Sequence, residues 1–237
     1  MNRFPHHDEF QIGRHRLNSG DVLGYLGNFL TSERVERIRQ AVEGRTYNVV
    51  SVLENIYDRG NISAVLRSAE AMGFQQAHVI ELSEKFKSSN RVTKGADKWL
   101  DVRRWKSTSE CVSELRLQGY QIVATHLDAK AKPIGEIDFT TPTAIVFGNE
   151  KDGISQEMVE HCDQTIIIPM CGFVQSFNIS VAAAISFYHI FLERKAKGLG
   201  GDLTSLEKQI LRAEFSLRTS ENPERLIEEL IARENPT

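Results

Sequence analysis

The sequence predicts an α/β protein whose sheet is mostly parallel, with helices on both faces. Short β-branched runs alternate with helix-length segments along the middle of the chain, and this alternation is typical of parallel sheets with crossover helices. The helix-length segments carry apolar residues at helical spacing. The 237 residues, of which 41% are hydrophobic, suit one globular domain with additional helices.

The chain is expected to begin with an arm and a charged helix. Residues 1–20 are polar and lack periodicity, so we expect a mobile arm there. His6 and His7 lie in this arm without the third ligand that zinc would need, so no metal site is expected. Residues 31–42 have the pattern of an amphipathic helix. Its apolar residues are Val35, Ile38 and Val42.

A strand and a capped helix are expected next. Residues 48–53 form the expected strand, and Asn61 is the expected cap of the following helix. Gly73 marks the end of that helix. The apolar stripe of the helix comprises Ile62, Val65, Leu66 and Ala69.

The remaining elements continue the alternation and divide the chain into three regions. Further strands are expected at residues 77–82, 121–125, 143–147 and 165–168, and helices at residues 108–118, 179–197, 203–217 and 223–233. Glycines at 198, 200 and 201 separate the last two helices from the rest. The expected regions are an arm and basic helix (1–45), a sheet domain (46–199) and a C-terminal helical extension (200–237).

Composition excludes several classes of protein. The formal net charge of -3 gives no global attraction to nucleic acid, so any RNA-binding surface must be a local patch. Cys111, Cys162 and Cys171 lack the spacing of a disulfide framework or a zinc site. No apolar run is long enough for an ordinary membrane span. Because no hydrophobic signal core opens the chain, we expect a cytoplasmic protein.

Polar side chains follow two of the expected strands. Ser176 and Asn178 lie between the strand that ends at Pro169 and a helix rich in alanine. Gly148 ends another strand, where it would let the backbone approach a ligand, and Glu150 follows it. Such groups at the carboxyl edge of a parallel sheet commonly form ligand sites. The two strand ends could hold an adenine edge, with apolar walls from Leu127, Ile168 and Phe177.

A third segment brings an arginine to the start of a helix. Arg67 lies two turns into the helix that Asn61 begins, away from the apolar stripe. Its guanidinium could reach back toward an anion bound at the helix start. Alternatively, Asn61 is only a helix cap and Arg67 a solvated charge.

The order of these motifs makes the pattern specific. The chain contains N-x5-R, then FGxE, then IPMxGxVQSxN, each preceded by an expected strand. In this order it resembles the SpoU/TrmH family of SPOUT RNA 2′-O-methyltransferases, and within it the bacterial branch that methylates guanosine 18 of tRNA. The resemblance covers about residues 34–199 and includes LEN, NISAVLR, ATHL, PTAIVFG, IPM, VQS and NISVAAA.

This resemblance implies a fold, a cofactor and an assembly. The C-terminal part of the sheet would be tied into a deep trefoil knot, an exception to the rule against threaded chains. S-adenosylmethionine would sit in the knot, and the protein would act as a homodimer whose interface could use the apolar faces of the terminal helical regions. By position, the cofactor pocket would be lined by Thr125, Leu127, Gly148, Ile168, Met170 and Phe177.

The resemblance also assigns roles in methyl transfer to a ribose 2′-hydroxyl. Arg67 would contact that hydroxyl. Since the pKa of arginine exceeds about 12, we expect Arg67 to stabilise the alkoxide and anchor a phosphate rather than act as the base. Asn61 would hold Arg67 and the ribose, Ser176 and Asn178 would position these groups, and Glu150 would orient them.

Basic residues would bind the RNA, with tRNA as the expected substrate. Arg34, Arg37, Arg45 and Lys98 match the family's basic positions. Because Glu33 and Glu36 lie among them, a solvated salt-bridged helix is the alternative for the first two.

The sequence leaves alternative functions open. Asp58 lies where the tRNA enzymes tend to be basic, so ribosomal RNA or another tRNA position is an alternative substrate. A non-catalytic knotted RNA-binding protein is a second alternative. A dinucleotide-binding dehydrogenase would need a G-x-G-x-x-G turn after the first strand, which this sequence lacks.

Overall fold

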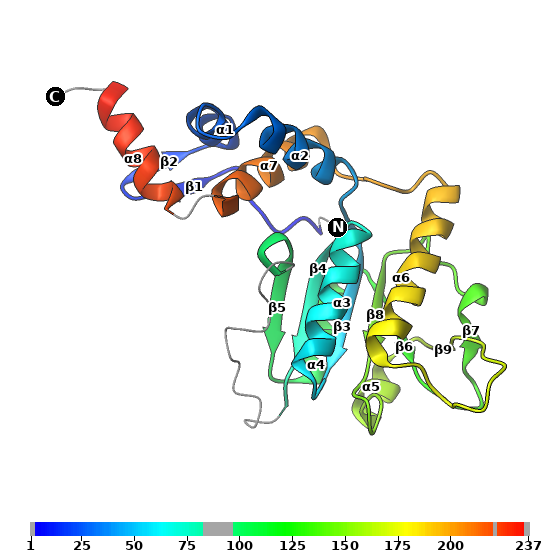
Figure 1. The fold of residues 1–237 in the computed structure, drawn as a ribbon. Helices are drawn as coiled ribbons and strands as arrows, with labels where there is room; N and C mark the ends of the chain where they lie inside the picture. Colours follow the sequence, from blue (N-terminus) through cyan, green and yellow to red (C-terminus); the bar gives the residue numbers. More distant parts are fainter. Residues whose placement is uncertain (1–2, 83–96, 220–221, 235–237) are drawn as a thin grey trace. The chain divides into compact units, whose positions relative to one another are not determined.

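The computed structural model describes residues 3–82, 97–219 and 222–234. The chain forms two compact units (Figure 1). The larger unit contains Arg3 and residues 46–200, and the smaller one contains residues 4–45 together with the described residues from 201 onward. The expected N-terminal region and C-terminal extension are therefore not separate, because their helices pack on each other.

The larger unit is built on a seven-stranded sheet in the order β5-β4-β3-β8-β6-β9-β7. All of its strand pairings are parallel, which confirms the predicted fold class. The strands are β3 (Thr46–Glu54), β4 (Phe74–Ile80), β5 (Asp101–Trp105), β6 (Gln121–Thr125), β7 (Lys132–Pro133), β8 (Thr143–Phe147) and β9 (Gln164–Ile167). The knot implied by the family resemblance stays a prediction.

Helices cover both faces of this sheet. They are α3 (Arg59–Ala71), α4 (Thr108–Leu117), α5 (Gln156–His161) and α6 (Ile179–Ala196), with short 3₁₀ turns at Asp97–Trp99 and Ile134–Glu136. Figure 1 shows α3 and α6 side by side over one face, where Phe187 of α6 meets Phe74 and Phe147 edge-to-face. On the other face, Val50 and Val52 pack with Cys111 of α4 and Met158 of α5.

Strand register brings the segments after several strands to one edge. Leu53 of β3 pairs with Phe147 of β8, and Ala124 of β6 pairs with Val146. Thr125 in turn pairs with Ile166 of β9. Because the strands are parallel and end at similar levels, the residues that follow them converge.

The smaller unit begins with a hairpin where a mobile arm was predicted. β1 (Phe10–Ile12) and β2 (His15–Leu17) pair antiparallel, and Phe10 and Ile12 are buried. Strands of three residues are too short to show periodicity in the sequence, so this prediction was wrong. The unit also contains α1 (Ser19–Gly27), α2 (Ser32–Glu43), α7 (Ser205–Thr219) and α8 (Pro223–Glu234).

Other differences from the sequence-based expectations also have local causes. Asp58, not Asn61, is the N-cap of α3, and its carboxylate accepts a hydrogen bond from the Gly60 N–H at 2.7 Å. The sequence did not reveal β5, because it is a charged strand at the sheet edge and carries Arg103 and Arg104.

Within the described ranges, every helix is too short or too polar to cross a bilayer.

Candidate active site

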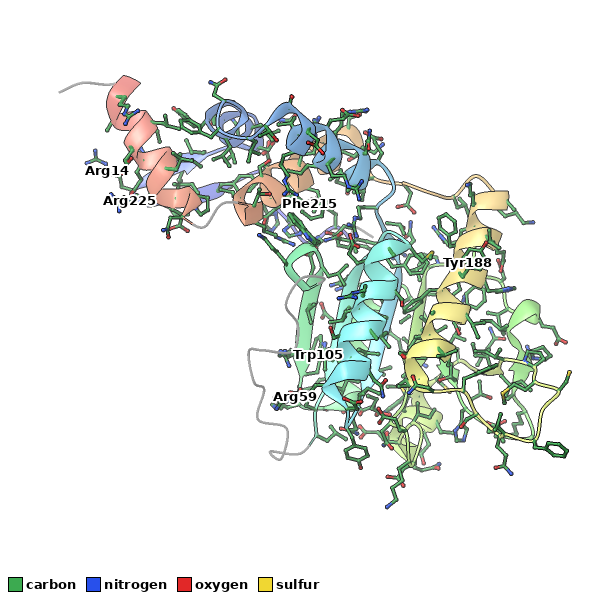
Figure 2. The ribbon with its side chains drawn as sticks, in the orientation of Figure 1. Arg14, Arg59, Trp105, Tyr188, Phe215 and Arg225 are labelled. Carbon is green, nitrogen blue, oxygen red and sulfur yellow. The ribbon has the colours of Figure 1, made fainter. Side chains whose placement is uncertain are left out.

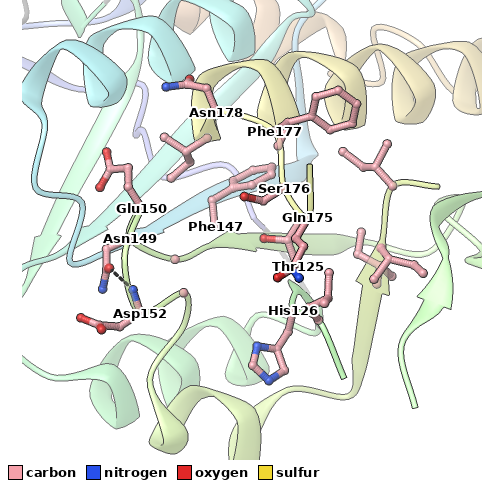
Figure 3. Close-up of a pocket in the computed structure, with 18 of the residues that line it drawn as sticks. Thr125, His126, Phe147, Asn149, Glu150, Asp152, Gln175, Ser176, Phe177 and Asn178 are labelled. Atoms are coloured by element: carbon pink, nitrogen blue, oxygen red, sulfur yellow. Dashed lines mark hydrogen bonds between the residues drawn. The ribbon is translucent and has the colours of Figure 1, made fainter. Parts of the chain in front are cut away.

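A pocket of about 560 Å³ opens at the carboxyl edge of the sheet (Figure 3). Its walls come from the segments that follow β6, β8 and β9 and from the first turn of α6. All six residues that were expected to hold a cofactor line it: Thr125, Leu127, Gly148, Ile168, Met170 and Phe177.

The loop after β8 folds back on itself at this pocket. Asn149 and Gly153 exchange backbone hydrogen bonds of 2.9 and 3.1 Å. The Asn149 side-chain oxygen accepts from the Lys151 and Asp152 N–H groups at 2.9 and 2.7 Å, the second of which is drawn in Figure 3. A Cβ on Gly148 would lie 2.1 Å from the carbonyl carbon of Gly153. The glycine is therefore required by the loop's own backbone and not, as predicted from the sequence, by the approach of a ligand.

Three of the predicted catalytic side chains meet beside the pocket. The Asn61 amide donates to Glu150 Oε1 at 2.6 Å, although the residues are 89 positions apart. The Asn178 amide donates to Asn61 Oδ1 at 3.4 Å across 117 positions. Glu150 also accepts a 3.4 Å hydrogen bond from the Tyr57 N–H. We call Glu150, Asn61 and Asn178 the rim network.

The carboxylate sets the direction of this network. An ionised carboxylate only accepts hydrogen bonds, so Asn61 must turn its NH₂ toward Glu150 and its oxygen toward Asn178. Asn178 must then donate with its NH₂, and its oxygen accepts from the N–H and hydroxyl of Ser180 at 2.9 and 2.6 Å. Asn178 is thus also the N-cap of α6. One acidic group orients two amides at a surface that a ligand can reach.

Two predicted catalytic residues lie outside the network. Ser176 is exposed and lines the pocket. Arg67 is exposed on α3, and it makes no hydrogen bond or ion pair within the described part of the chain. Within one chain, Arg67 therefore makes no hydrogen bond or ion pair with Glu150 or Asn178.

Three of the four predicted RNA-binding residues are exposed, and the fourth, Arg45, is buried. Arg34 and Arg37 are exposed on α2, and Glu36 pairs with Arg39 at 2.8 Å instead of with either of them. Hydrogen bonds from Arg39 and then Gln40 lower the pKa of Glu36 to about 2. Lys98 is exposed, with its ammonium 5.4 Å from the Trp99 ring centroid.

The prediction that Arg45 binds RNA was wrong. Its side chain is 3% exposed, and its guanidinium lies 5.5 Å from the Phe215 ring centroid inside the smaller unit. A buried guanidinium cannot contact a phosphate on the surface, so Arg45 does not belong to the RNA-binding set.

Sequence reasoning missed several pocket residues. They are polar groups next to predicted ones: His126, Asn149, Asp152 and Gln175. The polar run between the end of β8 and α5 was a usable signal, because a turn of that kind at a sheet edge commonly contacts a ligand. Clusters of three or more metal-binding side chains are absent from the described residues.

The fold and pocket define an α/β protein with a pocket of nucleoside size at the carboxyl edge of a parallel sheet. More narrowly, the chain belongs to the SpoU rRNA methylase family, whose model matches residues 48–188. The predicted family and the enzyme class, an RNA methyltransferase, are thereby confirmed.

Relatives in several bacteria carry one name, tRNA (guanosine(18)-2′-O)-methyltransferase. The protein of Borreliella burgdorferi is 34% identical over 209 residues, which cover 88% of this chain and 95% of the relative. The protein of Escherichia coli K12 is 36% identical over 166 residues, which cover 70% and 72%.

Solved structures resemble the fold. The Aquifex aeolicus TrmH/SpoU tRNA modifying enzyme has a TM-score of 0.72 and 32% identity, covering 79% of this chain and 96% of the other. The SpoU methyltransferase AviRb from Streptomyces viridochromogenes, in complex with AdoMet, has a TM-score of 0.55 and 28% identity, covering 65% and 62%.

Proposed function

We propose that this protein transfers a methyl group from S-adenosylmethionine to the ribose 2′-hydroxyl of guanosine 18 in tRNA. The observation that carries the proposal is the rim network, which joins three remote segments beside a nucleoside-sized pocket. The relatives named for this reaction support the choice of nucleotide. A tRNA substrate implies that the protein works in the cytoplasm.

The pocket suits S-adenosylmethionine in size and chemistry. Its volume of about 560 Å³ lies within the usual range for small-molecule sites. Leu127, Ile168 and Phe177 offer apolar walls, while Glu150 and Asp152 offer negative charge that would attract a positively charged sulfonium. When bound, this donor supplies a methyl group on a sulfonium.

The chain's own residues would orient the ribose and manage its charge. Asn61, held by Glu150, would hold the ribose, with Asn178 and Ser176 positioning both it and the pocket loop. Arg67 would stabilise negative charge on the 2′-oxygen. Because a guanidinium is a poor proton acceptor, an RNA phosphate would help to take the proton.

A homodimer would supply what one chain lacks. We propose that Arg67 of one subunit completes the site of the other, since within one chain it lies outside the rim network. An exposed apolar stripe on α6 is the proposed contact, and Figure 2 labels Tyr188 in it. The stripe comprises Val181 (45% exposed), Ile185 (37%), Tyr188 (53%) and Leu192 (45%). Its spacing of three and four residues keeps it on one helix face.

The terminal helices are poorer candidates for this contact than the sequence suggested. Several of their apolar residues, including Leu211, Phe215 and Ile227, are buried within the smaller unit, and of the large ones on α2 and α7 only Val35 and Leu206 are exposed within the described residues. Because those side chains already have a core to fill, they do not offer a free apolar face.

The test is methyl transfer to defined RNA. Purified protein, labelled S-adenosylmethionine and a tRNA transcript should yield one 2′-O-methylguanosine at position 18, and a transcript with 2′-deoxyguanosine there should accept none. Methylation of ribosomal RNA or of another tRNA position would overturn the proposed substrate. RNA binding without any transfer would favour the non-catalytic alternative.

A further inference from the structure

Glu54, at the end of β3, is a buried acid whose carboxylate accepts three hydrogen bonds. Its side chain is 0% exposed. Oε1 accepts from the Thr108 hydroxyl at 2.7 Å and from the Ser155 hydroxyl at 2.8 Å. Oε2 accepts from the Ser155 N–H at 2.8 Å. A buried carboxylate is costly unless it is well bonded, so its partners indicate what it holds in place.

Two of the three bonds fasten the end of the pocket loop. We call residues 148–155 the pocket loop. The strand before it is fixed to β3 by the pairing of Phe147 with Leu53. At its other end, Ser155 is fixed to Glu54, the next residue of β3. Both ends of the loop are therefore attached to adjacent residues of one strand.

The same stretch of chain also contacts the middle of the loop. After Glu54, Tyr57 donates its N–H to Glu150 and Asn61 donates its amide to the same carboxylate. With its ends fixed and its backbone folded back between Asn149 and Gly153, the loop has little freedom in where it places Glu150.

We propose that Glu54 is a positioning residue for methyl transfer: it fixes the pocket loop so that Glu150 orients the rim network. Because Glu54 is buried and does not line the pocket, it would not touch the ribose or the methyl donor. This inference rests on the proposed function, and it assigns a role to a side chain outside the predicted site.

The test compares Glu54→Gln with Thr108→Val. The glutamine keeps the volume, but its NH₂ must face either the Ser155 N–H, which can only donate, or the two hydroxyls, which would then have to accept instead of donate. Either arrangement should loosen the loop. Thr108→Val removes a bond to the same carboxylate from α4 and leaves both bonds to Ser155. Glu54→Gln should weaken S-adenosylmethionine binding by about tenfold and lower kcat by about tenfold, with the KM for tRNA unchanged. In Thr108→Val, the affinity for S-adenosylmethionine, the kcat and the KM for tRNA should all stay within about twofold of the wild-type values.

Hydrogen exchange supplies a readout that does not depend on catalysis. The amides of residues 149–155 should exchange about tenfold faster in Glu54→Gln than in the wild type, and at the wild-type rate in Thr108→Val. Should Glu54→Gln fail to fold, Ser155→Ala carries the same comparison, because it removes the hydroxyl bond from the loop side of the carboxylate. It also removes the N-cap bond from the Met158 N–H to the Ser155 hydroxyl, so faster exchange must appear in residues 149–155 and not only in α5.

The outcomes separate this inference from the proposed function. Equal losses of kcat in Glu54→Gln and Thr108→Val would show a general structural role and overturn the inference, as would unchanged loop exchange in Glu54→Gln. Wild-type protein that binds no S-adenosylmethionine would overturn the proposed function. The amide exchange rates of residues 149–155 would still show whether Glu54 holds the loop.

Discussion

Polar groups in the sheet interior and polar groups at its rim differ in what surrounds them. Glu54 is fully buried, and its partners are three donors of its own chain. Glu150 lies at the exposed rim, and it holds an amide that is itself open to a ligand. A glutamate is thus a structural support in the interior, at Glu54, and is available to a ligand at the rim, at Glu150. Changes to interior groups should therefore cost the most stability, with an effect on turnover only where, as at Glu54, the interior group fixes the pocket loop. Changes to rim groups should cost turnover and leave stability nearly unchanged.

His78 belongs with the interior groups. It is buried in β4, where its Nδ1 accepts from the Trp105 indole N–H at 2.9 Å and the two rings stack at 5.9 Å. Burial, with a smaller effect of Arg103, lowers the pKa of His78 from 6.5 to about 3. The folded protein therefore keeps this imidazole neutral over a range in which an unfolded chain would protonate it.

The largest effect is expected from Arg67→Ala, which should lower turnover by about 1,000-fold or more because it removes charge stabilisation at the reacting oxygen. The affinity for S-adenosylmethionine and the free energy of unfolding should stay near wild type, since the side chain is exposed. Single-turnover kinetics and calorimetry check this. Wild-type turnover would remove Arg67 from the reaction.

Glu54→Ala should give the largest loss of stability. It leaves three buried donors without their acceptor, which should lower the free energy of unfolding by about 4 kcal/mol. Urea denaturation measures this, and Glu150→Ala serves as the control. The control should change stability by less than about 0.5 kcal/mol, because Glu150 is at the surface. Equal losses in the two variants would contradict the contrast between interior and rim.

His78 should make the protein less stable in mild acid. Above pH 6.5 both states hold the imidazole neutral and it contributes nothing to pH dependence. As pH falls below 6.5 only the unfolded state takes up the proton, so stability is lost until the folded pKa of about 3 is reached. At pH 5 the loss should be about 2 kcal/mol.

The control for this pH effect is His78→Gln, whose side-chain oxygen can still accept from Trp105. Its free energy of unfolding should change less between pH 7 and pH 5 than that of the wild type. Glu36 contributes little between pH 7 and pH 5, because its lowered pKa matters mainly near and below its ordinary value of 4.5, and His78→Gln leaves that contribution in place. A variant as sensitive to pH as the wild type would exclude His78 as the cause.

The smallest effect is expected from the double change of Arg34 and Arg37 to alanine. Removing two phosphate contacts should weaken tRNA binding by about tenfold at low salt and less at high salt, because the salt dependence itself decreases. Filter binding over a range of salt checks this. Arg39→Ala is the matched control, since Arg39 is paired with Glu36. A parallel shift at all salt concentrations would argue against phosphate contacts.

The sequence by itself determined the elements with local patterns and the segments that carry chemistry. The strands at residues 121–125 and 143–147 agree with β6 and β8 in their bounds, because apolar runs and turn residues act over a few positions. The order of the motifs N-x5-R, FGxE and IPMxGxVQSxN, each after an expected strand, was what indicated the family.

Only the tertiary structure decided which of those residues meet. The bonds from Asn61 to Glu150 and from Glu54 to Ser155 span 89 and 101 positions, and no local pattern encodes a contact of that range. Burial likewise emerges only when elements pack. Packing placed Arg45 beside Phe215, ordered a hairpin from a polar segment, and made Gly148 necessary through the backbone of Gly153.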